Sequence, residues 1–350
     1  MFLYRILRPL LFALPPELAH SLTLKSLACL TRLGFSVCIP SDPIVLAGLT
    51  FPNRVGLAAG LDKNGQYLRA LEALGFGFIE VGTITPKPQI GNPKPRLFRS
   101  LKHHALLNRM GFNNQGVDAL VARLKHQRET HTFSCLIGVN IGKNADTPLD
   151  QALQDYQICF ERVYPYADYI TLNISSPNTQ GLQSLQAVAI LEGFLKSLVS
   201  LRDQYEKFVP LFVKIAPDLE PQEIQDMAHC ICQSGIDGVI ATNTTQSREG
   251  DIPELWKREK GGISGAPLLP SSAQALKTLC AALPQGFPVI AVGGISCAQD
   301  AIEKREAGAS LIQLYTGLVF QGVGLIAQIG RAFRVLPLSP QPLDRSPSSR

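Results

Sequence analysis

The sequence predicts an α/β fold: a closed (β/α)8 TIM barrel preceded by a small N-terminal helical extension. Short apolar runs recur eight times from residue 54 onward, and segments of helical character lie between most of them. Continuous apolar runs that alternate with helices are typical of a parallel sheet covered on both faces. Eight such units fit a closed barrel better than an open doubly wound sheet, and no GxGxxG follows the first run.

The first 40 residues are predicted to form two short amphipathic helices. MFLYRILRPLLFAL carries two arginines among apolar residues, and Pro15 and Pro16 separate it from PELAHSLTLKSLACLTRLG. We expect this pair to lie on a membrane surface, with packing on the main domain as the alternative. A signal peptide is disfavoured, because the apolar stretch is short, is broken by Pro9 and precedes no clean cleavage site. No apolar run is long enough for a membrane span.

Residues 41–336 are predicted to form the barrel, and 337–350, rich in Pro and Ser, a disordered tail. The predicted strands are RVGLAAG (54–60), FIEVGT (78–83), CLIGVNIG (135–142), YITLNIS (169–175), LFVKIAP (211–217), GVIATNT (238–244), VIAVGG (289–294) and LIQLYTG (311–317). Two long insertions follow the second and sixth strands. The first, which contains PKPQIGNPKPRLFRS, is expected to form ordered loop or short hairpins, and both are expected to shape the pocket.

The strand ends predict one polar pocket, because in such a barrel the carboxyl ends of all strands meet at the face that carries the active site. These ends read AAGLDK, GTIT, NIGKN, NISSPN, KIAPD, TNTT, GGIS and YTG. GGIS and YTG follow the seventh and eighth strands, where barrels often bind phosphate through backbone N–H groups. Gly265 in SGAPL is a candidate for a further backbone contact.

Two lysines and several amides give the pocket a chemical character. Lys63 and Lys214 lie at strand ends, where a lysine against an apolar interior needs an anionic or electron-rich partner, such as a flavin ring. Amide side chains donate and accept hydrogen bonds, so they suit a ligand with alternating C=O and N–H groups, such as a pyrimidine. The candidate amides are those of Asn108, Asn173, Asn178 and Asn243.

Catalysis by a Ser-His-Asp triad is not indicated, because none of the six histidines lies at a predicted strand end. Ser176 is a candidate base toward a carbon acid, although a serine needs a water or threonine relay for that role. The eight cysteines show no CxxC and no zinc-like spacing, so neither a metal site nor a disulfide framework is expected. The net charge of +5 suits an anionic ligand or membrane surface, and no basic run or module indicates nucleic acid.

These motifs resemble the dihydroorotate dehydrogenase family, and in particular its membrane-associated, quinone-using class. The resemblance covers about residues 1–335 and rests on AAGLDKNG, VGTITPKPQ, GNPKPRLFR, NRMGFNN, GVNIGKN, LNISSPNT, KIAPD, TNTT, AVGGI and QLYTGL. It implies an FMN-containing barrel that oxidises (S)-dihydroorotate to orotate in pyrimidine biosynthesis. It also implies a membrane quinone as electron acceptor, a peripheral position on the cytoplasmic side of the inner membrane if the protein is bacterial, and a monomer.

The resemblance also assigns residues. It makes Ser176 the base that removes the C5 proton while hydride passes from C6 to flavin N5. Arg99 would face the quinone tunnel formed by the N-terminal helices. FMN would be bound by Ala59, Gly60, Leu61, Asp62, Lys63, Thr83, Asn140, Asn173, Lys214, Thr242, Gly265, Gly294, Tyr315 and Thr316. The substrate would be bound by Lys63, Asn108, Arg109, Met110, Gly111, Phe112, Asn173, Asn178, Asn243 and Thr244.

Two other readings differ in acceptor or activity. A soluble FMN dehydrogenase would pass electrons to fumarate or NAD, but soluble members of the family use cysteine as the base, so Ser176 and the N-terminal extension disfavour it. A catalytically silent barrel that binds pyrimidines is disfavoured by the intact set of Ser176, Lys63, Lys214 and the asparagines.

Overall fold

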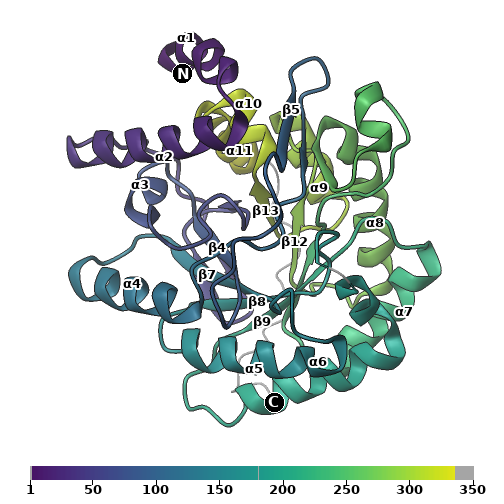
Figure 1. Cartoon of the computed structure of the whole chain (residues 1–350). Coiled ribbons are helices and arrows are strands. Elements are labelled where there is room, and N and C mark those ends of the chain that lie inside the picture. Colours follow the sequence, from purple (N-terminus) through teal and green to yellow (C-terminus); the bar gives the residue numbers. More distant parts are fainter. Residues whose placement is uncertain (1, 180, 336–350) are drawn as a thin grey trace.

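The structure, a computed structural model, describes residues 2–179 and 181–335. Its centre is a closed parallel barrel with the strand order β10-β12-β13-β3-β4-β7-β8-β9 (Figure 1). All eight predicted strands are present, so the predicted TIM barrel is confirmed. The strands are β3 (Val55–Leu57), β4 (Phe78–Ile84), β7 (Leu136–Ile141), β8 (Tyr169–Asn173), β9 (Leu211–Ile215), β10 (Gly238–Ala241), β12 (Val289–Val292) and β13 (Leu311–Leu314).

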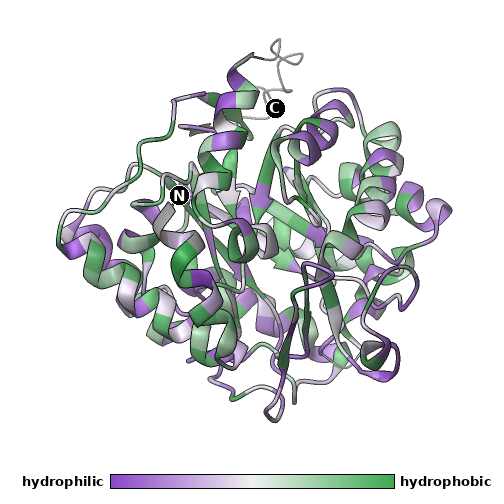
Figure 2. Cartoon of the chain, turned by 90° about the horizontal axis from the view of Figure 1, so that it is seen from above, coloured by the Kyte–Doolittle hydropathy of each residue, from purple (hydrophilic) through white to green (hydrophobic). Residues whose placement is uncertain are grey.

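Helices surround the barrel and bury their apolar faces against it (Figures 1 and 2). Most follow a strand directly, which is the connection that parallel strands require. They are α3 (Leu68–Glu72), α4 (Val117–Thr130), α5 (Ala152–Val163), α6 (Val188–Arg202), α7 (Pro221–Gln233), α8 (Leu269–Ala282), α9 (Ala298–Glu306), α10 (Thr316–Gln321) and α11 (Gly324–Val335). Four short 3-10 segments lie in the loops: η1 (Leu149–Gln151), η2 (Leu182–Gln186), η3 (Glu254–Arg258) and η4 (Ala266–Leu268).

The amino-terminal end of the barrel is closed by a hairpin of β1 (Ile44–Leu46) and β2 (Leu49–Phe51). Leu46 and Phe51 are buried against the first residues of several barrel strands, among them Phe78, Tyr169 and Phe212. Each of these rings occupies the space beside a glycine on a neighbouring strand; a Cβ on Gly138, for example, would lie 2.0 Å from the Tyr169 ring. The aromatic layer fills this end, so a ligand has to enter from the carboxyl end.

The two insertions meet in a small antiparallel sheet above the barrel. The first insertion supplies β5 (Leu97–Ser100) and β6 (Ala105–Asn108), which confirms the expected hairpin, and the second supplies β11 (Gly262–Gly265). The sheet order is β11-β6-β5, and Leu107, Trp256 and Ile263 contribute to a core of its own. Asn108 therefore stands at the end of a paired strand over the cavity.

The predicted N-terminal helices are α1 (Phe2–Ala13) and α2 (Pro16–Arg32), and they pack on the rim of the barrel (Figure 1). Arg99 on β5 donates to the carbonyl oxygens of Phe12 (2.6 Å) and Leu14 (3.0 Å). Its guanidinium also lies 4.3 Å from the centre of the Phe12 ring, and Arg8 donates to the Phe320 carbonyl at 2.7 Å. These contacts between α1 and the barrel hold the helical pair in place, and they do not depend on a membrane.

In the described part of the chain, no helix has the length and apolarity needed to cross a membrane. The helical pair nonetheless exposes large apolar side chains, including Leu10, Leu18 and Leu22. The predicted tail, residues 337–350, lies outside the described residues.

Candidate active site

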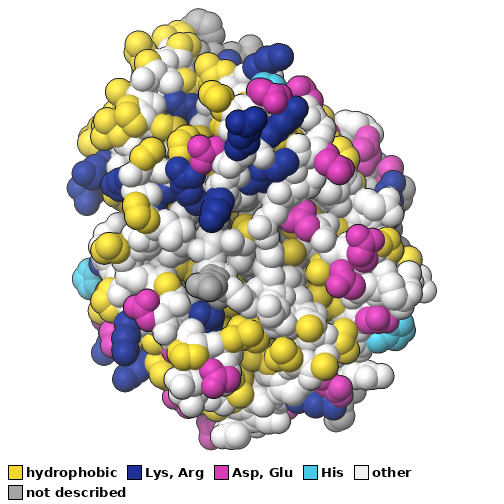
Figure 3. All heavy atoms as spheres, turned by 45° about the vertical axis from the view of Figure 1, so that its right-hand side comes forward, with side chains coloured by type: hydrophobic (Ala, Val, Ile, Leu, Met, Phe, Trp, Pro, Cys, Tyr) yellow, Lys and Arg dark blue, Asp and Glu magenta, His cyan; other side chains and the backbone are white. Residues whose placement is uncertain are grey.

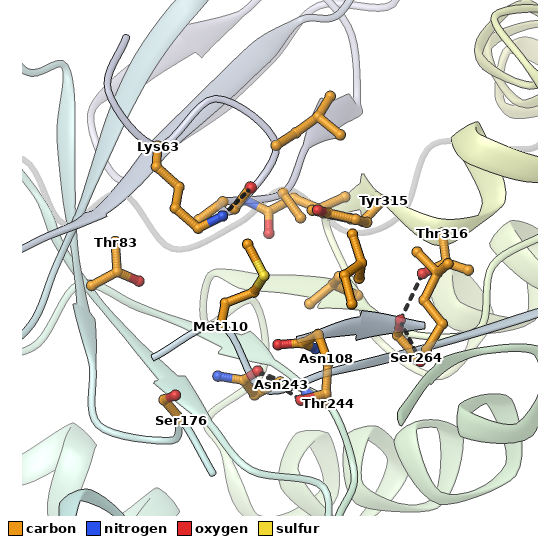
Figure 4. Close-up of a pocket in the computed structure, with 18 of the residues that line it drawn as sticks. Lys63, Thr83, Asn108, Met110, Ser176, Asn243, Thr244, Ser264, Tyr315 and Thr316 are labelled. Atoms are coloured by element: carbon orange, nitrogen blue, oxygen red, sulfur yellow. Dashed lines mark hydrogen bonds between the residues drawn. The ribbon is translucent and has the colours of Figure 1, made fainter. Parts of the chain in front are cut away.

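A cavity of about 310 Å³ lies at the carboxyl ends of the barrel strands, beneath β6 and β11. It brings together nearly all of the residues predicted for the site, as Figure 4 shows for those that it labels. These are Ala59, Gly60, Leu61, Asp62, Lys63, Thr83, Asn108, Met110, Gly111, Phe112, Asn173, Ser176, Asn178, Lys214, Thr242, Asn243, Thr244, Gly265, Gly294, Tyr315 and Thr316. The other three, Arg99, Arg109 and Asn140, do not line it.

Asn140 lies directly behind the cavity wall, in a network of buried polar side chains. Its Oδ1 accepts hydrogen bonds from Thr83 Oγ1 (2.5 Å) and Asn173 Nδ2 (3.1 Å). Asn173 Nδ2 also donates to Thr83 Oγ1 at 2.9 Å. The three side chains come from neighbouring strands β4, β7 and β8, so the barrel register fixes their geometry.

The network is anchored by Glu80, a fully buried acid on β4 that the sequence analysis did not single out. Its carboxylate accepts from Asn140 Nδ2 (2.8 Å), Gln313 Nε2 (2.8 Å), the Tyr169 hydroxyl (3.2 Å) and Thr171 Oγ1 (3.2 Å). A buried carboxylate needs such donors, because it is costly to leave without them. Glu80 thereby orients the side-chain amides of Asn140 and Gln313. Their nitrogens face Glu80, and their oxygens face away from it.

Two polar groups at the floor of the cavity remain available to a ligand. Gln313 Oε1 is buried without a hydrogen-bond donor among the described residues. Lys214, buried on β9, makes no hydrogen bond within the described part either, and burial lowers its pKa although the Glu80 carboxylate raises it. Gln313 Oε1 can accept a hydrogen bond from an N–H group of a heterocycle, and the Lys214 ammonium can stabilise negative charge that develops on it.

Lys63 projects from the β3–α3 loop into the cavity (Figure 4) and donates to the Gly60 carbonyl oxygen at 3.0 Å. Burial and, secondarily, the charge of Arg96 lower the pKa of Lys63 to about 8, against the smaller effects of Glu17 and Asp62. Its ammonium therefore lacks a strong counter-charge, so an anionic ligand beside it would be stabilised.

The next group of side chains surrounds Ser176, which is 5% exposed and lies in the loop after β8. The Asn178 backbone N–H donates to Ser176 Oγ at 3.3 Å, and Asn178 Nδ2 donates to Asn108 Oδ1 at 3.1 Å. Asn243 Nδ2 donates to Ser175 Oγ at 3.0 Å, while Asn243 Oδ1 accepts from the Thr244 N–H. The amides of Asn108, Asn178 and Asn243 thus lie beside the Ser175–Ser176 segment, and their role toward a ligand stays a prediction.

The far end of the cavity is lined by glycines whose backbone can approach an anion. Gly293 (φ +115°) and Gly294 (φ +80°) both have backbone conformations that favour glycine. A Cβ on Gly294 would lie 2.4 Å from the Leu269 Cα, so no other residue fits there. Ser264 and Thr316 hydroxyls, 2.8 Å apart, complete this end. The arrangement fits the predicted phosphate position after the seventh and eighth strands.

Three of the predicted site residues use their side chains to bind other parts of the protein. The Asp62 carboxylate lines the cavity but accepts the N–H groups of Gln66 (2.9 Å) and Tyr67 (2.7 Å), so it orders the loop. Arg109 points away and pairs with Glu259 outside the cavity. Arg99 clamps the end of α1, as described above. Sequence patterns alone do not give these side-chain directions.

Helix α2 adds residues that the sequence analysis did not assign: Glu17, His20 and Ser21 line the cavity. Glu17 pairs with the buried Arg96 at 2.9 Å. Burial and the charge of Lys63 lower the pKa of His20 to about 4, so its imidazole is neutral at pH 7. No histidine ends a predicted strand, so the strand pattern gives no signal for His20. Among the described residues, no cluster of His, Cys, Asp and Glu is placed to hold a metal ion.

Comparison with known proteins decides the family. Residues 44–335 match the family model of dihydroorotate dehydrogenase. The chain belongs to the dihydroorotate dehydrogenase family. Two relatives, from Herminiimonas arsenicoxydans and Marinomonas sp. (strain MWYL1), are each named dihydroorotate dehydrogenase (quinone). The first is 50% identical over 95% of this chain and 98% of its own length, and the second 52% identical over 93% and 95%.

Solved structures of dihydroorotate dehydrogenases agree. The crystal structure of DHODH in complex with ferulenol from Eimeria tenella has a TM-score of 0.81 and 38% identity, over 91% of this chain and 90% of that one. The ligand-free form from the same organism has a TM-score of 0.82 over 91% and 94%. The family is flavin-dependent in general, which matches the character of the cavity floor.

Proposed function

We propose that this protein oxidises (S)-dihydroorotate to orotate, with FMN as the bound cofactor and a membrane quinone as the electron acceptor, in pyrimidine biosynthesis. The observation that carries the proposal is the cavity itself, which places Ser176, the asparagine cluster, Lys63 and Lys214 within one volume that also reaches a glycine-lined anion position. Close relatives named for the quinone-dependent enzyme support the choice of acceptor.

FMN fits the residues present. Thr83, Asn173, Lys214 and Gln313 would hold the flavin ring, with Asn140 supporting Thr83 and Asn173 from behind, and Gly294 and Thr316 would hold the phosphate. Bound FMN would supply a two-electron acceptor that takes hydride from C6 of dihydroorotate. The chain contributes a rigid, pre-oriented frame, because Glu80 fixes two of the amides from behind.

The substrate chemistry would fall to Ser176, the neighbouring asparagines and Lys63. Ser176 Oγ would take the C5 proton, so that a C5–C6 double bond forms as hydride leaves C6. Asn108, Asn178 and Asn243 would hold the pyrimidine C=O and N–H groups, and Lys63 would stabilise its negative charge. Burial of Ser176 limits competing proton transfer to bulk water.

The acceptor would approach from the helical pair, because α2 is the element outside the barrel and its loops that lines the cavity. Exposed leucines on α1 and α2 would contact the membrane, where a lipid-soluble quinone resides. We expect a peripheral position on the cytoplasmic side of the inner membrane and a monomeric protein. Arg99, which orders the end of α1, would shape this route rather than the substrate pocket.

The experiment is an anaerobic titration of the purified protein. Its bound flavin should bleach when dihydroorotate is added and recover when a short-chain ubiquinone follows. Recovery with fumarate or NAD in place of quinone would assign a different acceptor. A bound flavin that dihydroorotate does not reduce would refute the proposed substrate.

A further inference from the structure

A second cavity, about 810 Å³ in volume, lies on the surface beside the substrate end of the active site. It is formed by the base of the β5–β6 hairpin, the 246–261 loop and the Pro177–Asn178 turn. Asn178 lines both cavities and is bonded to Asn108 at 3.1 Å, so the two volumes meet at this side chain.

The lining of this cavity is strongly basic. It contains six cations, Lys94, Arg109, Arg248, Lys257, Arg258 and Lys260, and one acid, Glu259. That surplus equals the net charge of +5 of the whole chain, so the charges elsewhere balance. Figure 3 shows Lys and Arg side chains gathered in the upper half of one face.

Neighbouring acids neutralise only part of this surplus. Glu259 pairs with Arg109, Glu254 with Lys257 at 2.7 Å, and Glu17 approaches Lys94 only to 4.0 Å. The other three cations form no ion pair among the described residues, although, against the larger lowering effect of burial, the Asp218 carboxylate raises the pKa of Arg248. Of these, Arg248 donates to carbonyl oxygens, including those of Glu259 and Gly261 at 2.7 Å, while Arg258 and Lys260 are exposed.

We propose that this basic cavity is an electrostatic vestibule that attracts the anionic substrate and hands it to the active site past Asn178. The inference rests on the proposed function, because dihydroorotate carries one carboxylate. A cluster of like charges at a cleft raises the local concentration of a counter-ion and its association rate, by an amount that falls as salt rises. The vestibule would act on association and leave the chemical step unchanged.

The test compares two double variants of the flavin-loaded, full-length protein. Arg258→Gln/Lys260→Gln removes two unpaired vestibule charges. Lys125→Gln/Lys277→Gln, on the outer helices α4 and α8, removes two exposed charges elsewhere and is the matched control. Association of orotate with the oxidised enzyme is followed by stopped-flow flavin absorbance at low and high salt. Flavin reduction at saturating dihydroorotate is measured separately.

We expect the vestibule variant to bind orotate about fourfold more slowly at low salt, since each charge roughly 10 Å from an anion in water contributes about twofold. The difference should shrink as salt is added, and flavin reduction at saturation should equal that of wild type. The control variant should match wild type throughout.

Three outcomes would overturn the proposal. Equal association rates in both variants would show that the patch does not steer substrate. Unchanged association combined with weaker binding to vesicles containing anionic phospholipid would assign the patch to the membrane instead. A wild-type protein whose flavin responds to neither dihydroorotate nor orotate would refute the proposed function, and the vestibule with it. If the wild-type flavin responds normally, either of the first two outcomes refutes the vestibule alone.

Discussion

Ligand affinity should depend on pH through Lys63. The pKa of this buried ammonium is about 8 instead of the ordinary 10.5, because burial and Arg96 disfavour the charged form. An anion bound beside Lys63 favours that charged form and would raise the pKa again. The affinity for orotate should therefore be greatest below pH 8, where the lysine is already protonated, and should fall as the pH rises above it.

The size of the effect follows from the same values. A pKa displaced from 10.5 to about 8 corresponds to about 3 kcal/mol. An anion that restores the ordinary pKa can therefore gain at most roughly 300-fold in binding affinity from the charge of Lys63. Between pH 7 and pH 9 the protonated fraction of a group with a pKa near 8 falls about tenfold. The dissociation constant of orotate should rise by the same factor, about tenfold.

The assay is a titration of oxidised holoenzyme with orotate, followed by flavin absorbance from pH 7 to pH 9. Lys63→Met should bind orotate weakly and without this pH dependence. Lys207→Met is the matched control, because burial also lowers the pKa of Lys207 but this lysine precedes β9 at the opposite end of the barrel. A flat profile in wild type, or the same rise in Lys63→Met, would refute the reasoning.

Three further variants separate the parts of the site. Ser176→Ala should retain FMN but reduce it at least about 100-fold more slowly with dihydroorotate in stopped flow, and an unchanged rate would move the base elsewhere. Glu80→Gln puts an amide NH2 group among four side chains that donate to the Glu80 carboxylate, so FMN retention on gel filtration should fall. Full retention would show that Glu80 does not orient the amides at the cavity floor. Arg99→Gln should impair quinone turnover and spare flavin reduction by dihydroorotate, because the lost bonds hold only α1; equal loss of both would place Arg99 in the substrate half.

The barrel and most of the cavity could be predicted because parallel strands all end at one edge. Any polar residue at the carboxyl end of a predicted strand, such as Asn173 or Lys214, reaches that edge without further information. The loop residue Ser176 follows the same rule, because it lies three residues beyond β8.

What sequence patterns could not give was the direction of side chains inside and outside the barrel. The apolar run FIEVGT predicts a strand but no role for Glu80, although an acid within such a run is itself a signal, since a buried carboxylate requires hydrogen-bond donors. His20 reaches the cavity only because α2 packs on α3 and β5, a contact between segments remote in sequence. Arg109 belongs to a predicted substrate loop, yet pairing with Glu259 turns it outward.

The surroundings of the cavity argue that the two half-reactions use different routes. On one side, α2 contributes His20 and Ser21 from a helical pair that exposes leucines, which suits an apolar quinone. On the other, Asn178 separates the substrate end from a basic surface cavity, which suits an anion. An apolar ligand gains nothing from the basic side, and a carboxylate would lose hydration on the apolar side. Substrate and acceptor therefore need not exchange through one opening, and a defect in either route should leave the other half-reaction at its normal rate.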